Sequence, residues 1–304
     1  MIIETQNGLK ILKGINGYEA LFIDSSRIDD CIRYLHENNL KKISINPFQG
    51  YHANDLNFLS RLEHYIEGIT VLDDKYDYAI INSLHKLKSL GIIDNKRDSI
   101  DLSNFPELES LSCDYSKRMV SLESCEQLRS LTLSGYKSGD KTIEKIPRLS
   151  SLVTLNLLIT NVTSLAGIGN FPILRELTLF RASRLEDISD LTNVKNTLIK
   201  LEFDVCKKIS SYDTLGKLVK LQKLIIGSSA LIESLSFVRL LPELEFISFV
   251  DTNVVDGDLT PAIGIGYVGF DNKRHYNLKF SDFNKGRVAG NRSHDTHRQG
   301  QKTT

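Results

Sequence analysis

Glu202 and Asp204 are the residues of this sequence whose types and spacing come nearest to acid–base chemistry. Residues two apart in a β-strand point to the same face, so the two carboxyl groups would lie close together, as paired carboxylates do in hydrolytic enzymes. The histidines of the N-terminal half show no spacing typical of a triad or a ligand set. These histidines are His36, His52, His64 and His85. We therefore expect Glu202 and Asp204 to face solvent or a partner.

Two further patterns suggest ligand binding, but their surroundings argue against it. Residues Gly264 to Gly269 spell G-x-G-x-x-G, which holds dinucleotide phosphates only between a strand and a helix. No helical pattern follows and no βαβ unit surrounds it, so these glycines indicate turns. His294 and His297 could hold a metal ion, yet they lie in a polar stretch that would give the ligands no support. We expect no enzymatic activity, no cofactor and no bound metal.

A repeated phrase of leucines is the strongest pattern in the chain. The L-x-x-L-x-L motif of Leu152-Val-Thr-Leu155-Asn-Leu157 recurs 22 residues later in Leu174-Arg-Glu-Leu177-Thr-Leu179. Its fourth and sixth positions alternate as in a strand and point inward, while positions three, five and seven point outward. One such strand cannot bury its apolar side alone, whereas stacked copies bury a continuous core. The phrase therefore predicts an elongated stack of repeats.

The phrase occurs about ten times, at steps of 20 to 26 residues. It begins at Leu40, Ile66, Leu87, Leu108, Leu128, Leu152, Leu174, Leu198, Leu221 and Leu244. This step matches leucine-rich repeats and is shorter than ankyrin, tetratricopeptide or HEAT units. The fold class we predict is an α/β leucine-rich repeat solenoid. A curved parallel sheet forms its concave face, and short helical or 3₁₀ segments form its convex face.

The run Leu155-x-Leu157-x-x-Thr160-x-Val162-x-x-Leu165-x-x-Ile168 resembles the short repeats of bacterial internalins and of Sds22-like phosphatase regulators. The resemblance covers about residues 40–255 and implies a curved scaffold whose concave sheet binds another macromolecule. The corner Asn usual in these repeats is replaced by other residues, so the resemblance implies irregular hydrogen bonding there. The replacing residues are Thr160, Cys206, Ser229 and Thr252.

The four cysteines fit the repeats better than a disulfide or metal site. No two have C-x-x-C spacing, and none lies beside a histidine. Cys113 takes the inward sixth position of its repeat, and Cys206 lies at the strand-to-loop corner. We expect both to be buried as small hydrophobic residues, the usual state of a free cysteine.

The segments on either side of the repeats are expected to form caps that close the two ends of the core. Residues 1–39 form an expected N-terminal cap, with a strand over Tyr18–Asp24 and a helix over Arg27–Asn38 capped by Ser25 or Ser26. Residues 40–255 hold the repeats, and residues 256–283 are expected to form a C-terminal cap with one or two strands. Residues 284–304 are polar and basic, so we expect a disordered tail.

The outward positions of the middle repeats supply the candidate partner-binding residues. An exposed cluster of Tyr115, Tyr136, Leu158 and Phe180 would be costly without a use, and aromatic residues with Arg are typical interface anchors. The alternative is that loops of the chain itself cover these side chains. The full candidate set is Tyr115, Tyr136, Asn156, Leu158, Thr178, Phe180, Arg181, Glu202 and Asp204.

Charge patterning offers a second guide to a partner. Acidic residues gather towards the strand ends, whereas Lys41, Lys88 and Lys223 are among the basic residues at the strand starts. The sheet could therefore carry opposite charges along its two edges and guide a partner into register. The alternative is that the acids bond turns and the basic residues only solvate an edge.

Composition excludes some partners. Lys plus Arg number 38 and Asp plus Glu 38, so no net field favours nucleic acid. No apolar run approaches the length of a membrane span, and Glu4 interrupts any signal-like start. We expect a cytoplasmic monomer that binds a protein partner without catalysis, as a scaffold or as an inhibitor of the immunity type. The alternative is an enzyme or effector whose chemistry lies in the C-terminal segment, with the repeats recognising its substrate.

Overall fold

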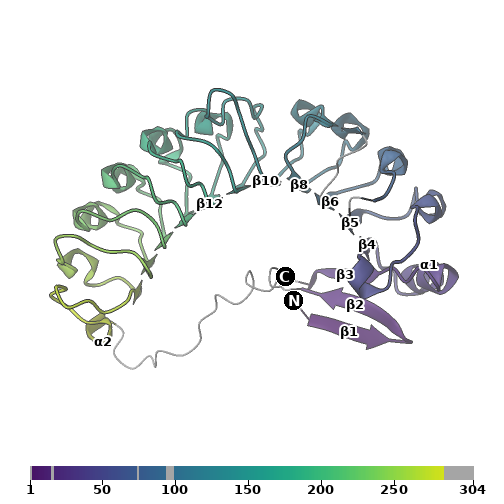
Figure 1. Ribbon diagram of the computed structural model, residues 1–304, viewed down its shortest axis with the longest axis horizontal. Helices are drawn as coiled ribbons and strands as arrows, with labels where there is room; N and C mark the ends of the chain where they lie inside the picture. Colours follow the sequence, from purple (N-terminus) through teal and green to yellow (C-terminus); the bar gives the residue numbers. More distant parts are fainter. Residues whose placement is uncertain (1, 15–16, 74, 94–98, 284–304) are drawn as a thin grey trace.

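The computed structural model describes residues 2–14, 17–73, 75–93 and 99–283. The chain forms a crescent whose inner side is lined by one long sheet and whose outer side carries short helical turns (Figure 1). This arrangement is the predicted solenoid. The expected tail, residues 284–304, and its His294 and His297 lie outside the described residues.

The main sheet contains 14 strands among the described residues, and its spatial order follows the sequence. The first three strands are antiparallel, and all later neighbours are parallel. The strands are β1 (Ile2–Gln6), β2 (Leu9–Lys13), β3 (Glu19–Phe22), β4 (Lys42–Ile45), β5 (Gly68–Leu72), β6 (Ser89–Ile93), β8 (Ser110–Asp114), β10 (Ser130–Ser134), β11 (Thr154–Leu158), β12 (Glu176–Phe180), β13 (Lys200–Asp204), β14 (Lys223–Gly227), β15 (Phe246–Ser248) and β16 (Tyr267–Gly269).

The register of the sheet stacks each repeat on its counterpart. Leu155 pairs with Leu177, and Leu157 pairs with Leu179, so the inward leucines of adjacent repeats lie side by side. All four side chains are fully buried. Burying each leucine contributes about 1.5–3 kcal/mol. The inward positions predicted from the leucine phrase are therefore confirmed, including Cys113, which is buried at its sixth position.

The convex side is built mainly from 3₁₀ turns that stack along the crescent. Their apolar spacing near three residues lets most of these turns bury one or two residues, among them Leu59 of η3 and Ile168 of η7. The turns are η2 (Pro47–Gln49), η3 (Asn57–Arg61), η4 (Ala79–Ser83), η5 (Leu102–Asn104), η6 (Leu122–Ser124), η7 (Ile168–Asn170), η8 (Ser189–Val194), η9 (Asp213–Lys217), η10 (Ser236–Leu240) and η11 (Thr260–Ala262). Two short strands, β7 (Ile100–Asp101) and β9 (Met119–Val120), form a second parallel sheet.

Helix α1 (Ile28–Glu37) lies at the N-terminal end of the crescent (Figure 1). Its N-cap is Arg27, which provides no side-chain hydrogen bond, so the predicted serine cap is wrong. The Ser25 hydroxyl instead accepts a hydrogen bond from the His52 amide at 2.9 Å, because the next repeat packs against this turn. The β1–β2 hairpin extends the sheet beyond the predicted first strand.

The C-terminal end of the sheet is closed by aromatic side chains. Phe270, directly after β16, stacks on Phe249 at 5.3 Å and contacts Phe280 and Phe283 of helix α2 (Phe280–Phe283). One of the one or two expected strands is present, because the second stretch forms turns and α2. Gly264 has φ +95° as expected of a turn, whereas Gly269 lies within β16, where a Cβ atom would come within 2.9 Å of the Tyr267 ring. No helix among the described residues is long and apolar enough to cross a membrane.

Candidate protein-binding surface

The ends of β11 and β12 carry an apolar patch with a neighbouring cation. Leu158 ends β11 and pairs in register with Phe180 at the end of β12, and both side chains are half-buried. The Arg181 guanidinium lies 5.1 Å from the centroid of the Phe180 ring, a cation–π contact. Arg181 itself is exposed. The structure therefore brings three of the predicted residues together on adjacent strands.

Tyr115 and Tyr136 contact each other, but only one of them reaches the surface. Tyr115 is 41% exposed, and its ring meets that of Tyr136 edge-on at 4.7 Å. Tyr136 is fully buried, and its hydroxyl donates to the Thr142 carbonyl at 3.2 Å. The prediction of an exposed Tyr136 is wrong because Gly135, with φ +70°, turns the chain so that Tyr136 takes the inward corner position. The alternative, that loops of the chain cover such a side chain, holds for Tyr136.

A polar row crosses the same face through the fifth positions. Asn156 pairs in register with Thr178, which pairs with Glu202. The Asn156 amide donates to the Thr132 hydroxyl at 3.0 Å, and the Glu202 carboxylate lies 3.7 Å from the Lys200 ammonium. All three members of the row are half-buried. The predicted polar residues therefore adjoin the apolar patch, and Asn156 and Glu202 are held by Thr132 and Lys200.

Asp204 lies at the end of β13, beside the apolar patch and two residues from Glu202. Its neighbour in register is Gly227, where an added Cβ atom would come 3.2 Å from the Asp204 carboxylate. A glycine at this position leaves the carboxylate room on the concave face. Both acids are half-buried, and their role in binding a partner stays a prediction.

Basic residues at the strand starts are engaged within the sheet. The Lys88 ammonium lies 3.0 Å from the Glu67 carboxylate. Lys41 lies 3.4 Å from the centre of the Tyr65 ring. These contacts satisfy much of the positive edge locally, which favours the alternative that these residues solvate the edge rather than form a charge stripe.

Sequence reasoning missed two aromatic residues on the concave face. Phe246 of β15 and Tyr267 of β16 stack with ring centroids 4.7 Å apart and planes at 15°. The Lys223 ammonium lies 4.7 Å from the Phe246 ring on the other side. Both aromatic residues occupy the third position of their repeats. The same strand alternation that selected positions five and seven would have found them.

Corner residues of several repeats tie the strand end to its neighbour. The Thr252 hydroxyl donates to the Ile226 carbonyl at 2.9 Å and accepts from the Ser229 amide at 3.1 Å. The Ser229 hydroxyl accepts in turn from the Cys206 amide at 3.1 Å. The Cys206 thiol lies 3.4 Å from the Leu179 carbonyl. Hydroxyl and thiol groups thus take the place of the corner Asn at these repeats, whereas Ala182 has no polar side chain at its corner.

One residue before each corner holds a left-handed backbone. These positions have φ between +46° and +70° and are Gly135, Ile159, Arg181, Val205, Ser228 and Asp251. The turn allows the Ile159 amide to donate to the Phe180 carbonyl at 2.8 Å, and the Arg181 amide to the Asp204 carbonyl at 2.8 Å. It also places these side chains along the rim of the concave face. Ile159 is 52% exposed there.

Reactive groups are scarce in the described part of the chain. No group of three or more His, Cys, Asp or Glu residues there is placed to hold a metal ion. All four cysteines are buried. Burial raises the pKa of the Cys113 thiol to about 12 and that of Cys206 to about 12, so neither is a nucleophile near neutral pH.

Comparison with known proteins supports the fold. No protein-family model and no curated protein sequence matches the chain. The structure of an internalin, InlF of Listeria monocytogenes, is similar with a TM-score of 0.53 and 18% identity, covering 84% of this chain and 83% of that one. The functional domain of InlJ from Listeria monocytogenes gives a TM-score of 0.49 and 19% identity over 76% of this chain. This chain spans 47% of that InlJ structure.

Because the sequence identities are below 20%, these comparisons support the fold alone. With its 14-stranded sheet, corner ladder and stacked 3₁₀ turns, the chain is a leucine-rich repeat solenoid. Its architecture is internalin-like, as the likeness to InlF shows.

Proposed function

We propose that this protein is a scaffold that binds a partner protein on its concave face without catalysing a reaction. The observation that carries the proposal is the in-register pair of Leu158 and Phe180 beside the exposed Arg181. Half-exposed apolar side chains on an open sheet face are costly unless a partner covers them, and aromatic residues with Arg dominate interface energetics.

The binding surface we propose contains eight of the nine predicted residues, because Tyr136 is buried. Leu158, Phe180 and Arg181 form its centre, and Tyr115 adds aromatic area at one side. Asn156, Thr178, Glu202 and Asp204 form its polar margin. The stacked pair of Phe246 and Tyr267 extends the surface towards the C-terminal end.

We further propose that binding blocks the partner, as an inhibitor or an immunity-type protein does. A concave sheet encloses a convex surface and excludes other ligands from it. The balanced charge of the chain supports a protein partner over nucleic acid. In this proposal the protein acts as a cytoplasmic monomer.

Affinity capture with a double variant tests the surface. The change Leu158→Asp with Phe180→Asp puts two charges where a partner would desolvate them. We expect at least about a tenfold loss of partner capture from a lysate of the source organism, since a central anchor contributes about 2 kcal/mol or more. Isothermal titration with the purified captured protein checks the affinity directly.

The matched control is Leu240→Asp, which places a charge on the exposed convex side. It should leave capture unchanged. Circular dichroism confirms that each variant is folded. Equal affinity of the folded double variant and the wild type would refute the proposed surface, and unaltered partner activity in the saturated complex would refute the inhibitory role.

A further inference from the structure

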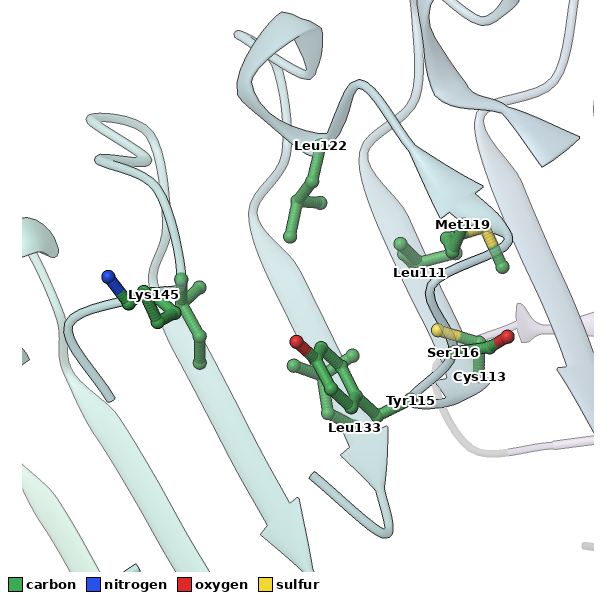
Figure 2. Close-up of a pocket in the computed structure, with 9 residues that line it drawn as sticks. Leu111, Cys113, Tyr115, Ser116, Met119, Leu122, Leu133 and Lys145 are labelled. Atoms are coloured by element: carbon green, nitrogen blue, oxygen red, sulfur yellow. The ribbon is translucent and has the colours of Figure 1, made fainter. Parts of the chain in front are cut away.

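The stack of 3₁₀ turns is interrupted at the fifth repeat, where the described segment 135–151 forms no helix and no 3₁₀ turn. A cavity of about 40 Å³ lies beside this break. Figure 2 shows Tyr115 among the side chains that line it, together with Leu111 of β8 and Leu133 of β10. The cavity has room for water but not for a ligand, since ligand pockets usually measure about 300–1,000 Å³. Because Tyr115 also belongs to the proposed concave surface, the cavity is part of that surface.

The N-terminal edge of the main sheet lies apart from this surface. Strand β1 is the first strand of the sheet and pairs with β2 alone. The β1–β2 hairpin has a two-residue turn, Asn7 and Gly8, with φ of 52° and 75°, as in a type I′ turn. The residues that flank such a turn exchange both backbone hydrogen bonds, so Gln6 is bonded to Leu9.

Alternation along β1 then determines which backbone groups are free. Every second residue counted back from Gln6 directs its N–H and C=O groups to β2, whereas Ile3 and Thr5 direct theirs away from the sheet. The Gly14 amide supports this parity, because it donates to the Tyr18 carbonyl at 2.7 Å on the β3 side of the hairpin. Outside the β1–β2 ladder, no hydrogen bond among the described residues involves the backbone of Ile3 or Thr5. The outer edge of β1 therefore offers two donors and two acceptors.

The side chains of β1 favour pairing with another strand. Ile2 is 69% exposed, Ile3 is 46% exposed, and Thr5 is exposed as well. Edge strands commonly resist pairing through Pro, Lys or a bulge, and β1 contains none of these. Its one charged group, the Glu4 carboxylate, lies 3.0 Å from the Lys13 ammonium. The edge therefore fits a β-branched strand that carries no unpaired charge.

The opposite end of the sheet is covered. Helix α2 lies against β16, where the Phe280 ring meets the Tyr267 ring edge-on at 6.5 Å (Figure 1). Covering an edge with a helix is a common way to prevent strand addition. A second copy could therefore add at β1 but not from β1 to β16. This asymmetry excludes a head-to-tail filament and favours a closed pair.

We propose that two copies of this chain associate through their β1 edges, as antiparallel strands related by a two-fold axis. The axis passes beside Glu4, so Ile3 of each copy pairs with Thr5 of the second copy, and four backbone hydrogen bonds form. The second copy fits because β1 is itself a β-branched strand without an unpaired charge. The two Glu4 side chains then lie opposite each other, which is unfavourable for bare carboxylates, but each is neutralised by Lys13 of its own copy.

The pair goes beyond the proposed function, in which one copy binds the partner. A five-residue strand buries far less than the about 1,600 Å² of a standard interface, so the association is weak. The protein is then a monomer at low concentration and a pair at high concentration. Because β1 lies at the end of the crescent, both concave faces stay open in the pair (Figure 1). Two open faces would bind a clustered partner more tightly than one.

Sedimentation velocity over a series of concentrations tests the pair. We expect the average mass to rise from one chain towards two as the concentration increases from about 5 µM to about 500 µM. Ile3→Pro removes an outward donor but no bond to β2, so it should weaken association at least about tenfold while the hairpin stays folded. Ile3→Lys places a charge at the edge and should weaken association at least about fivefold. The matched control is Leu231→Lys, at a side chain that is 59% exposed in a distant repeat, and it should change nothing.

Hydrogen exchange measured by NMR locates the contact. The amides of Ile3 and Thr5 should exchange more slowly as the concentration rises, because they become bonded only in the pair. Amides of β16 should exchange at a constant rate. Protection confined to β16 or to the concave strands β11 and β12 would overturn the proposal.

A mass that stays at one chain up to about 500 µM would also overturn the proposal. Equal association of Ile3→Lys and Leu231→Lys would do the same. Both lysine variants alter exposed side chains, so this comparison remains decisive if Ile3→Pro fails to fold. Partner capture is a separate readout, because Ile3→Pro should still capture the partner and the double variant of Leu158 and Phe180 should still form the pair.

Discussion

Ile159 is a β-branched residue in a left-handed conformation, with φ +56°. Such a residue is strained there because its Cβ atom crowds the backbone, whereas glycine adopts this conformation freely. The strain persists because the Ile159 amide must reach the Phe180 carbonyl in the next repeat. The backbone strain at Ile159 therefore accompanies a hydrogen bond that links two adjacent repeats.

Ile159→Gly tests this account. We expect the free energy of unfolding to rise by about 0.5–1 kcal/mol in urea denaturation, because relief of strain outweighs the added flexibility of the unfolded chain. The matched control is Ile173→Gly, since Ile173 is similarly exposed, at 45%, and has no positive φ. That control should lose stability by about 0.5–1 kcal/mol. A loss of stability in both variants would contradict the strain.

The thiols give a second prediction at this scale. Burial raises the pKa of Cys113 and Cys206 to about 12 and of Cys125 to about 11, and it also raises the pKa of Cys31. At pH 8 we expect Ellman's reagent to label no cysteine of the folded protein and all four after denaturation. Rapid labelling of any thiol in the folded protein would contradict the burial.

The same shifts have a consequence for stability against pH. Unfolded thiols ionise near their ordinary pKa of 9.0, whereas the folded thiols stay protonated to higher pH. The stability that they contribute is therefore fully present below pH 9 and is lost as the pH rises through about 11 to 12. Cys113→Ala should flatten this decline in urea denaturation measured from pH 8 to pH 11.

At the scale of elements, the corner ladder ties each strand to the next repeat. Thr252→Val keeps the shape of the side chain but removes both of its hydrogen bonds. Because Thr252 is buried, we expect a loss of about 1–3 kcal/mol in the free energy of unfolding. Thr252→Ser keeps the hydroxyl and should lose less. Equal losses in the two variants would show that packing, not hydrogen bonding, matters at the corner.

The strands could be predicted because their leucines must face one core at a period of two. Tyr136 was misplaced because the turn at Gly135 depends on backbone torsion, which leucine spacing does not reveal. The break at the fifth repeat was also hidden. Ile143, Ile146 and Leu149 keep the spacing of three that forms 3₁₀ turns elsewhere, yet side-chain bonds of Ser138 impose a loop.

The candidate surface could be predicted in part because side chains alternate between the two faces of a strand. Alternation placed Leu158, Phe180 and the polar row correctly on the outward side. It could not show that Lys88 meets Glu67 or that Lys223 covers Phe246, since these contacts depend on which strands are neighbours. Cross-strand partners follow from register, and register follows from the whole sheet.

At the scale of the whole molecule, each repeat is stabilised by contacts with its neighbouring repeats only. Phe270 anchors the aromatic cluster at the C-terminal end and is largely buried. Phe270→Ala should cost about 3 kcal/mol in the free energy of unfolding. Hydrogen exchange should accelerate in β15 and β16 but not in β5 and β6. Phe48→Ala, at a side chain that is 89% exposed, should change neither quantity. Uniform acceleration along the crescent would contradict nearest-neighbour coupling.

The two ends of the sheet are capped by different structures. An antiparallel hairpin, β1–β2, lies at one end, and an aromatic cluster follows β16 at the other. Neither depends on how many repeats separate them. A gene that duplicated residues 174–197 in frame would therefore encode a longer crescent with both terminal structures intact. Changes in copy number would lengthen the concave sheet without altering the core of the existing repeats.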